Sequence, residues 1–391
     1  MNETSAVLWR RVWAIALVQG SVTIMWLIYR LYLGDLFKNW GFSEEFVVGL
    51  LTFEMVLGLI MEPLFGALSD RQQRALGTRF PLIALGVILS AGSFLLIPLI
   101  FLLPISTAGK FILPLVAIAW ALAMTLFRSP TMVLIGQCAP VNQLPLAMGV
   151  LSLVGGIIAA FRKPISNWLL SLGSLPCFLL GSLVLIGASL FLSRVLPPIQ
   201  KKEKVNAIRP NSFPGIAMVN IALFAVTTTW GMRVLLLVLT KQLEVFNNGL
   251  MGVQILLALV AIPAGWLIRK TAQPVAFLTT AIFLLALTLF CLLNGFWLPA
   301  LALFWVLGSS ILNNGLIPLL LEILKGNHTG VGIGLYFGSV GVASEIFTRY
   351  WSTQSNQIQG GLGLAMLVIA ALLCVQYLPN LPQMRISKID D

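Results

Sequence analysis

The sequence is poor in charged residues and has no long polar segment. Only 9% of its 391 residues are Asp, Glu, Lys or Arg, 59% are hydrophobic and the mean hydropathy is +0.97. Soluble domains carry about a quarter charged residues, so this composition excludes a soluble globular protein. The missing polar segment excludes a catalytic domain held by one membrane anchor. Continuous apolar runs, in place of alternating polar positions, exclude an outer-membrane barrel.

Residues that bind metals or drive chemistry are equally scarce. The chain has one histidine and four cysteines, none of them in CxxC spacing, so the sequence predicts no metal site. It also lacks the GxxxxGK[ST] loop that binds nucleoside triphosphates. We therefore expect no enzyme activity, no cofactor and no direct use of ATP. The cysteines are interpreted as small packing residues.

Twelve apolar runs are long enough to cross a bilayer as helices, each needing about 20 residues. They lie near residues 12–34, 46–68, 81–103, 112–137, 146–166, 176–196, 214–239, 248–268, 274–293, 297–321, 331–351 and 361–378. A polar stretch separates the sixth run from the seventh. The sequence predicts an all-α polytopic membrane protein with two six-helix bundles, 1–196 and 214–391, a linker at 197–213 and a short tail after the last run.

Basic residues gather in alternate loops. Of the 24 Lys and Arg residues, fifteen fall on the side that holds the linker and both termini, six on the opposite side, and three within the runs. Cytoplasmic loops are rich in Lys and Arg, so we expect the termini and the linker to be cytoplasmic, in an inner or other energised membrane. Membrane orientation accounts for the positive net charge, and no nucleic-acid partner is expected.

The two halves resemble each other in sequence. The first run, IALVQGSVTIMWLIYRLYL, and the seventh, IALFAVTTTWGMRVLLLVL, both begin Ile-Ala-Leu, and in both a Trp is soon followed by an Arg (Trp26 and Arg30, Trp230 and Arg233). LAMGVLSLVGG in the fifth run likewise resembles GVGIGLYFGSVG in the eleventh. A six-plus-six duplication is the layout of secondary transporters that bind their substrate between the halves.

A motif follows the second run. The stretch GALSDRQQRALGTR contains Gly66, Asp70, Arg71, Gly77 and Arg79. An aspartate among arginines can form charge-assisted hydrogen bonds. A glycine in a helix permits close helix packing, and a glycine in a loop permits a turn with positive φ.

The motif resembles the loop between helices 2 and 3 of the major facilitator superfamily. With FRSPTMVLIGQCAP and LAMGVLSLVGG, it is similar to the sucrose–proton and glycoside–cation symporter branch. The resemblance implies two six-helix bundles related by a pseudo-two-fold axis, a cytoplasmic latch built from the motif in one state, and alternating access. It also implies a monomer that transports a small solute, a sugar or glycoside, with protons or another cation as the coupling ion.

Two other functions remain open at this stage. The first is export of amphiphilic compounds, and the second is pigment delivery or assembly of photosynthetic complexes without transport. One position also departs from the sugar symporters, because Gln137 stands where these relatives usually carry an aspartate implicated in proton coupling. A glutamine cannot titrate, so either another carboxylate couples transport to protons or the protein is not a proton symporter.

Six ionisable residues fall inside the runs, where charge is costly and marks functional sites. Their depths, at about 1.5 Å per residue, permit three ion pairs: Glu62–Arg128, Arg233–Glu345 and Arg30–Glu54. Glu62 lies deep and shares its depth with an arginine. If transport is driven by protons, we therefore expect Glu62 to carry the coupling proton.

Aromatic and amide side chains within the runs are candidates for a sugar site, because rings stack on sugar faces and amides bond hydroxyl groups. In the superfamily, helices 1, 4, 7 and 10 line the cavity. The candidates on these helices are Gln19, Trp26, Tyr29, Trp230, Asn313 and Asn314. Packing and an interfacial aromatic belt are the alternative roles for these residues.

Overall fold

The computed structural model describes residues 7–100, 107–196, 215–244, 246, 248–271, 274–296, 298–324, 328–352 and 356–376. Over these ranges the ordered elements are all helices, which confirms the predicted all-α class. The predicted linker at 197–213 and the tail after residue 376 lie outside the described residues.

Thirteen α-helices and three short helical turns make up this part of the chain. In order they are α1 (Trp9–Asn39), α2 (Glu44–Leu76), α3 (Phe80–Ile100), α4 (Thr107–Val133), η1 (Leu134–Gln137), η2 (Val141–Gln143), α5 (Leu144–Ala160), α6 (Arg162–Leu172), α7 (Ser174–Val195), α8 (Gly215–Leu243), α9 (Gly249–Lys270), α10 (Pro274–Leu293), α11 (Leu298–Ile323), α12 (Thr329–Ile346), η3 (Phe347–Trp351) and α13 (Asn356–Val375). Twelve segments are long and apolar enough to cross a membrane. The protein is a multi-pass integral membrane protein.

The sequence of α2 shows how its ends are set. Ser43 accepts a hydrogen bond from the backbone N–H of Phe46 at 3.2 Å, and Glu44 and Glu45 occupy the first turn. A capping hydroxyl and early carboxylates both favour a helix N-terminus. Gly77 ends the helix with φ of 72°, the left-handed conformation that glycine adopts freely. The positive φ predicted for this glycine is confirmed.

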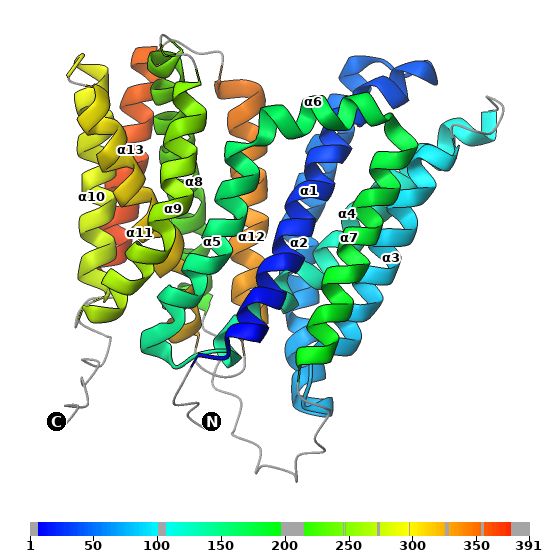
Figure 1. Cartoon of the computed structure of the whole chain (residues 1–391), viewed down its shortest axis with the longest axis horizontal. Coiled ribbons are helices and arrows are strands. Elements are labelled where there is room, and N and C mark those ends of the chain that lie inside the picture. The colour runs from blue at the N-terminus through cyan, green and yellow to red at the C-terminus, as the bar shows by residue number, and fades with distance from the viewer. Residues whose placement is uncertain are drawn as a thin grey trace.

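The fifth predicted span is corrected by the structure. It runs to 166 in the sequence, but α5 ends at Ala160 and the separate helix α6 begins at Arg162. Pro164 has no N–H to donate to the carbonyl of Ala160, and the loss of this hydrogen bond favours a break here. Figure 1 shows α6 lying across the ends of its neighbours rather than along them.

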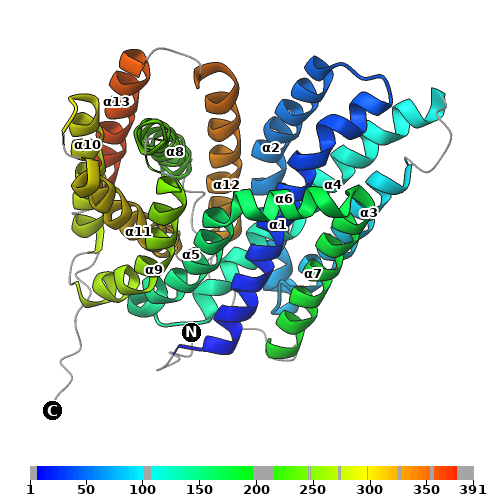
Figure 2. The same cartoon turned by 45° about the horizontal axis from the view of Figure 1, so that its top comes forward.

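The helices form two groups, α1–α7 and α8–α13 (Figure 1). The groups meet mainly where α2 packs against α12 and α5 against α9. These helices are the second, eleventh, fifth and eighth spans, so a pseudo-two-fold axis exchanges the two contacts. Below, "terminal side" means the side of the bundle on which α1 begins and α13 ends (Figures 1 and 2).

The α2–α12 contact is made by glycines that bring the two backbones together. A Cβ atom on Gly66 of α2 would overlap the backbone of Gly330, and one on Gly334 of α12 would overlap the carbonyl of Glu62. One turn further along, Gly338 contacts the backbone of Leu59. Small residues four apart permit this approach between membrane helices. The predicted close approach at Gly66 is confirmed, and the stripe on α12 is its counterpart.

The four cysteines are free, and three of them are buried. Cys138 lies between η1 and η2, outside the membrane-spanning segments, where burial raises the pKa of its thiol to about 12. A thiol with so high a pKa is protonated and unreactive at neutral pH. A packing role agrees with this environment.

We expect Gly334→Ala to separate α2 from α12, because the new methyl group has no room beside the Glu62 carbonyl. Spin labels at Ala75 of α2 and Arg269 of α9, both exposed on the terminal side, would report a longer distance in a cysteine-free background. Gly341→Ala is the matched control, since its Cβ would lie 3.6 Å from the Met55 sulfur, an ordinary contact. Equal distances in the two variants would contradict the backbone contact.

Candidate functional site

A cavity of about 360 Å³ lies between the two halves. Its wall is built by α1, α2, α4, α6, α8 and α12, and its charged lining residues are Arg30, Glu54, Glu62, Arg128, Arg162 and Arg233. The α2–α12 contact separates the cavity from the terminal side. On the opposite side, Arg162 at the start of α6 forms part of the cavity wall. Six ionisable residues were predicted to lie within the spans. Five of them line this cavity, and the sixth, Glu345, does not.

The predicted pair Glu62–Arg128 is confirmed. Arg128 of α4 forms an ion pair with Glu62 Oε1, and the Ser129 hydroxyl donates to Glu62 Oε2 at 2.7 Å. Both carboxylate oxygens therefore have partners, and Glu62 is fully buried. The guanidinium of Arg128 also lies 5.2 Å from the centre of the Phe337 ring on α12. Both partners favour the charged form of Glu62.

Glu345 has different partners from the one predicted. Arg30 of α1 reaches across the cavity, its Nη2 lying 2.8 Å from Glu345 Oε2. Arg349, four residues on in the π-helical turn η3, places its Nε 2.6 Å from Oε1. The carboxylate is thus held between one arginine from each half of the protein.

The predicted pairs Arg233–Glu345 and Arg30–Glu54 are therefore wrong. Arg233 donates instead to the hydroxyl of Ser344. Depth along a helix fixes only one coordinate of a side chain, and the pairing also depends on which way each helix is rotated. Among the described residues, Arg162 and Arg233 form no ion pair.

Glu54 contacts a tyrosine rather than an arginine. The hydroxyl of Tyr29 on α1 donates to Glu54 Oε1 at 2.5 Å. The Tyr29 ring lies 4.2 Å from that of Trp120 and 5.7 Å from that of Trp26, centre to centre. Tyr29 is fully buried in this aromatic cluster.

The residues predicted for sugar binding do not gather in the cavity. Trp26 lines it, and Tyr29 lies behind the wall against Glu54. Trp230 packs edge-on against Phe347 and Trp351, at 6.0 and 5.7 Å between ring centres. Of the six predicted residues, Trp26 is the one that borders the cavity.

The three predicted amide residues lie elsewhere. Gln19 is half-buried on α1, nearer the terminal side than Trp26, and Asn313 is exposed on α11. Asn314 is buried, donates to the carbonyl of Ala261 at 2.5 Å and accepts from the Ser152 hydroxyl at 2.7 Å. It therefore joins α5, α9 and α11 and is not among the residues that line the cavity.

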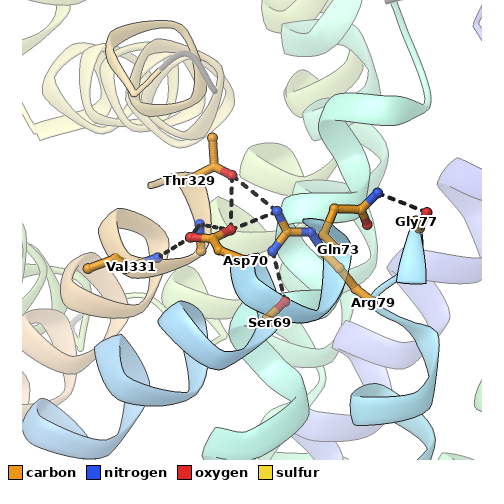
Figure 3. Close-up of polar contacts among 8 residues, drawn as sticks. Ser69, Asp70, Gln73, Gly77, Arg79, Thr329 and Val331 are labelled. Atoms are coloured by element: carbon orange, nitrogen blue, oxygen red, sulfur yellow. Dashed lines mark hydrogen bonds and ion pairs between the residues drawn. The ribbon is translucent and has the colours of Figure 1, made fainter. Parts of the chain in front are cut away.

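A second polar cluster closes the terminal side (Figure 3). Asp70, near the end of α2, accepts hydrogen bonds from the backbone N–H of Gly330 at 2.9 and 3.0 Å and of Val331 at 3.2 Å. These N–H groups belong to the first turn of α12, where a helix has free donors and a positive dipole end. Asp70 thus caps a helix of the other half.

Arg79 completes this cluster. Its Nη2 lies 2.7 Å from Asp70 Oδ1 and 3.3 Å from the Thr329 hydroxyl, and its Nη1 donates to Ser69 at 2.8 Å. Asp70 and Arg79 are 3% and 4% exposed, so the ion pair is shielded from water. Arg71, also predicted for the latch, is exposed, unlike the two buried members of the ion pair.

The sequence reasoning missed the partner of this cluster. Thr329 and Gly330 contact Asp70 from a position some 260 residues away. The available signal was the glycine-rich beginning of the eleventh run, because a helix start offers unpaired N–H groups. Gln73, whose amide donates to the Gly77 carbonyl at 2.9 Å, was also not foreseen.

Twelve membrane helices in two halves around a charged cavity that is closed on one side define a membrane transporter fold. The sequence profile of the Major Facilitator Superfamily matches residues 14–348. The chain belongs to this superfamily of transporters. No curated protein sequence gives a significant match.

Solved structures share the fold at low sequence identity. The human organic anion transporter MFSD10 (TETRAN) aligns over 95% of this chain and 100% of its own, with a TM-score of 0.66 and 14% identity. A bacterial homologue of the iron transporter ferroportin, outward-facing with soaked iron, aligns over 95% and 99% with a TM-score of 0.68 and 14% identity. The same homologue, outward-facing, gives 0.67 over 94% and 99% at 14%. Identity this low supports the fold alone.

We expect Asp70→Asn to shift the protein toward a state that is open on the terminal side. The substitution removes the charge that holds the first turn of α12, and a hydrogen bond to a charged group contributes about 1.5–3 kcal/mol. The ratio of open to closed molecules should rise roughly 10-fold or more. The label pair at Ala75 and Arg269 measures this ratio. Arg71→Gln, an exposed charge one residue away, is the control and should leave the ratio unchanged; a similar response in both variants would refute the role of Asp70.

We expect Arg128→Met to lower the unfolding temperature of the purified protein in detergent, because it leaves the buried Glu62 carboxylate unpaired. Breaking a buried pair in this way costs about 3–5 kcal/mol. The double variant Glu62→Gln/Arg128→Met removes both charges and should recover much of the loss. A double variant no more stable than Arg128→Met would mean that the pair is not what stabilises this region.

Proposed function

We propose that this protein is a secondary transporter that moves a small organic anion through the central cavity by alternating access. The observation that carries the proposal is the pair of arginines on the cavity wall, Arg162 and Arg233, that have no carboxylate partner among the described residues. Arg30 and Arg128, the other two lining arginines, are already paired. The cavity therefore presents positive charge to whatever enters it.

An anionic group is the natural partner for this charge. The planar guanidinium of an arginine matches the two oxygens of a carboxylate, phosphate or sulfonate and binds them through charge-assisted hydrogen bonds. Arg162 lies at the start of α6 and Arg233 midway along α8. A ligand that bridges them would contact both halves, as a transported substrate must.

The rest of the lining favours an organic body on that anion. The cavity volume of about 360 Å³ is within the range of small-molecule sites. Between the charged groups the wall has apolar surfaces formed by Met55, Met124, Phe337 and Val340, beside the hydroxyl groups of Thr125, Ser344 and Thr348. An inorganic ion would leave these surfaces facing water. One structural neighbour is described as an organic anion transporter, but the arginines of this chain support the proposal.

We also propose that the terminal side faces the cytoplasm, as the count of Lys and Arg residues predicts. The closed α2–α12 contact then makes this conformation open to the outside. In the opposite state, the Asp70 cluster would separate and the cavity would close above the substrate. The cluster acts as a latch in this scheme, because its bonds exist in one state only.

A sugar or glycoside with cation coupling, the substrate of the branch that the motif resembles, is the second candidate. Trp26 supports it, since its ring lies on the cavity wall beside Arg30, whose guanidinium is 5.9 Å from the ring centre. An aromatic face can stack on a sugar ring. The two candidates differ in charge, and the same binding experiment separates them.

We expect the purified protein to bind aliphatic and aromatic carboxylates, sulfonates or phosphate esters in preference to their neutral amides and to sugars. Titration calorimetry of matched pairs of compounds measures this preference. For the best anion, Arg233→Gln and Arg162→Gln should each weaken binding roughly 10-fold or more, because each removes a charge-assisted bond of about 1.5–3 kcal/mol.

Lys163→Gln is the control, because it removes a neighbouring exposed charge that does not line the cavity. Its affinity should equal that of the wild type. Binding of a sugar with no preference for anions would favour the second candidate. Equal losses in Arg233→Gln and Lys163→Gln would show that net charge, not the cavity arginines, determines affinity.

A further inference from the structure

Glu54 stands apart from the other two carboxylates of the membrane region. Glu62 has Arg128 and Ser129 on its two oxygens, and Glu345 has an arginine on each. Glu54 is 3% exposed and lines the cavity, yet it forms no ion pair among the described residues. Its one hydrogen bond is the 2.5 Å contact from the Tyr29 hydroxyl to Oε1.

The second oxygen of Glu54 has no partner within the part of the chain that the structure describes. Oε2 is buried and accepts no hydrogen bond from any of these residues. A buried carboxylate with neither a cation nor a full set of donors is costly as an anion, whereas its neutral acid avoids most of that cost. Tyr29 can donate to the carbonyl oxygen of such an acid, which leaves Oε2 to carry the proton.

From this geometry we infer that Glu54 is a proton-binding site at the cavity wall. The proton comes from water in the cavity that Glu54 lines, binds the Glu54 carboxylate and returns to the cavity when it is released. The coupling proton predicted for Glu62 is thereby reassigned, because the oxygens of Glu62 are taken by Arg128 and Ser129. Proton binding at Glu54 does not depend on the proposed transport function. Only the role of this proton as the coupling ion rests on that function.

The surroundings of Glu54 connect its proton to the contact between the halves. The titratable and charged groups that face it come from the helices packed against α2: Tyr29 and Arg30 from α1, Arg128 from α4 and Glu345 from α12. Arg128 is held by Glu62. Arg30 adjoins Tyr29 in sequence, and it acts on Glu54 electrostatically while pairing with Glu345 of the other half.

When Glu54 loses its proton, its carboxylate therefore competes with Glu345 for Arg30. A charged Glu54 attracts the guanidinium that spans the cavity to Glu345, and the link between α1 and α12 weakens. With the proton bound, Arg30 is free to pair across the cavity, as it does in this conformation. Proton binding at Glu54 thus favours the state that is closed on the terminal side, and proton release favours leaving it.

Infrared pH-difference spectra of the purified full-length protein, with no substrate added, test the site directly. The carbonyl stretch of a protonated carboxylic acid should appear in the wild type as pH falls, and it should be lost in Glu54→Gln. Glu62→Gln is the matched control, a second buried glutamate of the same helix, and should keep the band. Tyr29→Phe should keep it with a shifted frequency, because the carbonyl loses its donor.

A wild-type band that survives in Glu54→Gln, or one that is lost in Glu62→Gln instead, would overturn the assignment. Spin labels at Ala75 and Arg269 test the connection to the halves. Raising the pH should increase the fraction open on the terminal side in the wild type and have no such effect in Glu54→Gln. An unchanged pH response in that variant would refute the coupling. Neither measurement uses a solute, so failure of the anion proposal would leave both results standing.

Discussion

The closed side of the protein depends on one carboxylate placed at the start of a helix. Asp70 accepts the free N–H groups of Gly330 and Val331, and it pairs with Arg79. Each partner separately would leave a buried charge incompletely stabilised, because an aspartate at a helix end still requires a cation when water is absent. Together, the helix N–H groups and Arg79 offset the cost of burying the Asp70 charge between two apolar bundles. The glycine contacts, the cavity above them and its accessible side all follow from this junction.

The junction also explains why the neighbouring positions are glycine. Gly66 precedes Asp70 by one turn, and Gly330 is the residue that the carboxylate caps. Any side chain at either position would hold the helices apart and move the carboxylate out of reach of the N–H groups. Close packing and charge capping therefore require each other here, which accounts for the occurrence of both in one short motif.

Much of this could be predicted from the sequence, because the bilayer constrains it strongly. Span number and fold class follow from apolar runs that must satisfy their own backbone hydrogen bonds. Asp70, Arg79 and Gly66 were identified from a short motif and its resemblance to a loop of the superfamily, and the Glu62–Arg128 pair followed from matching depth. These predictions use one coordinate, position along a helix, which sequence gives well.

The remaining site residues depend on helix rotation and on distant partners. Arg30 pairs with Glu345 instead of Glu54 because α1 and α12 turn those side chains toward each other. Asn313 and Asn314 differ by one residue, yet the first is exposed and the second buried. Composition does not reveal this difference in a membrane protein, because apolar residues face both the lipid and the protein interior. Amide or aromatic character alone could not place these residues at the cavity.

The glycine stripe on α12 has a consequence for how the protein moves. Interlocked side chains would let two helices slip apart by degrees, one rotamer change after another. Here backbone lies on backbone at Gly330, Gly334 and Gly338, so no interdigitated side chains have to separate at these positions. Within this helix pair, the polar bonds at one end hold the helices together, and the smooth glycine surfaces provide no intermediate state once these bonds break. Opening of this side should therefore proceed as a single cooperative step, with a rate set at one end of the helix pair.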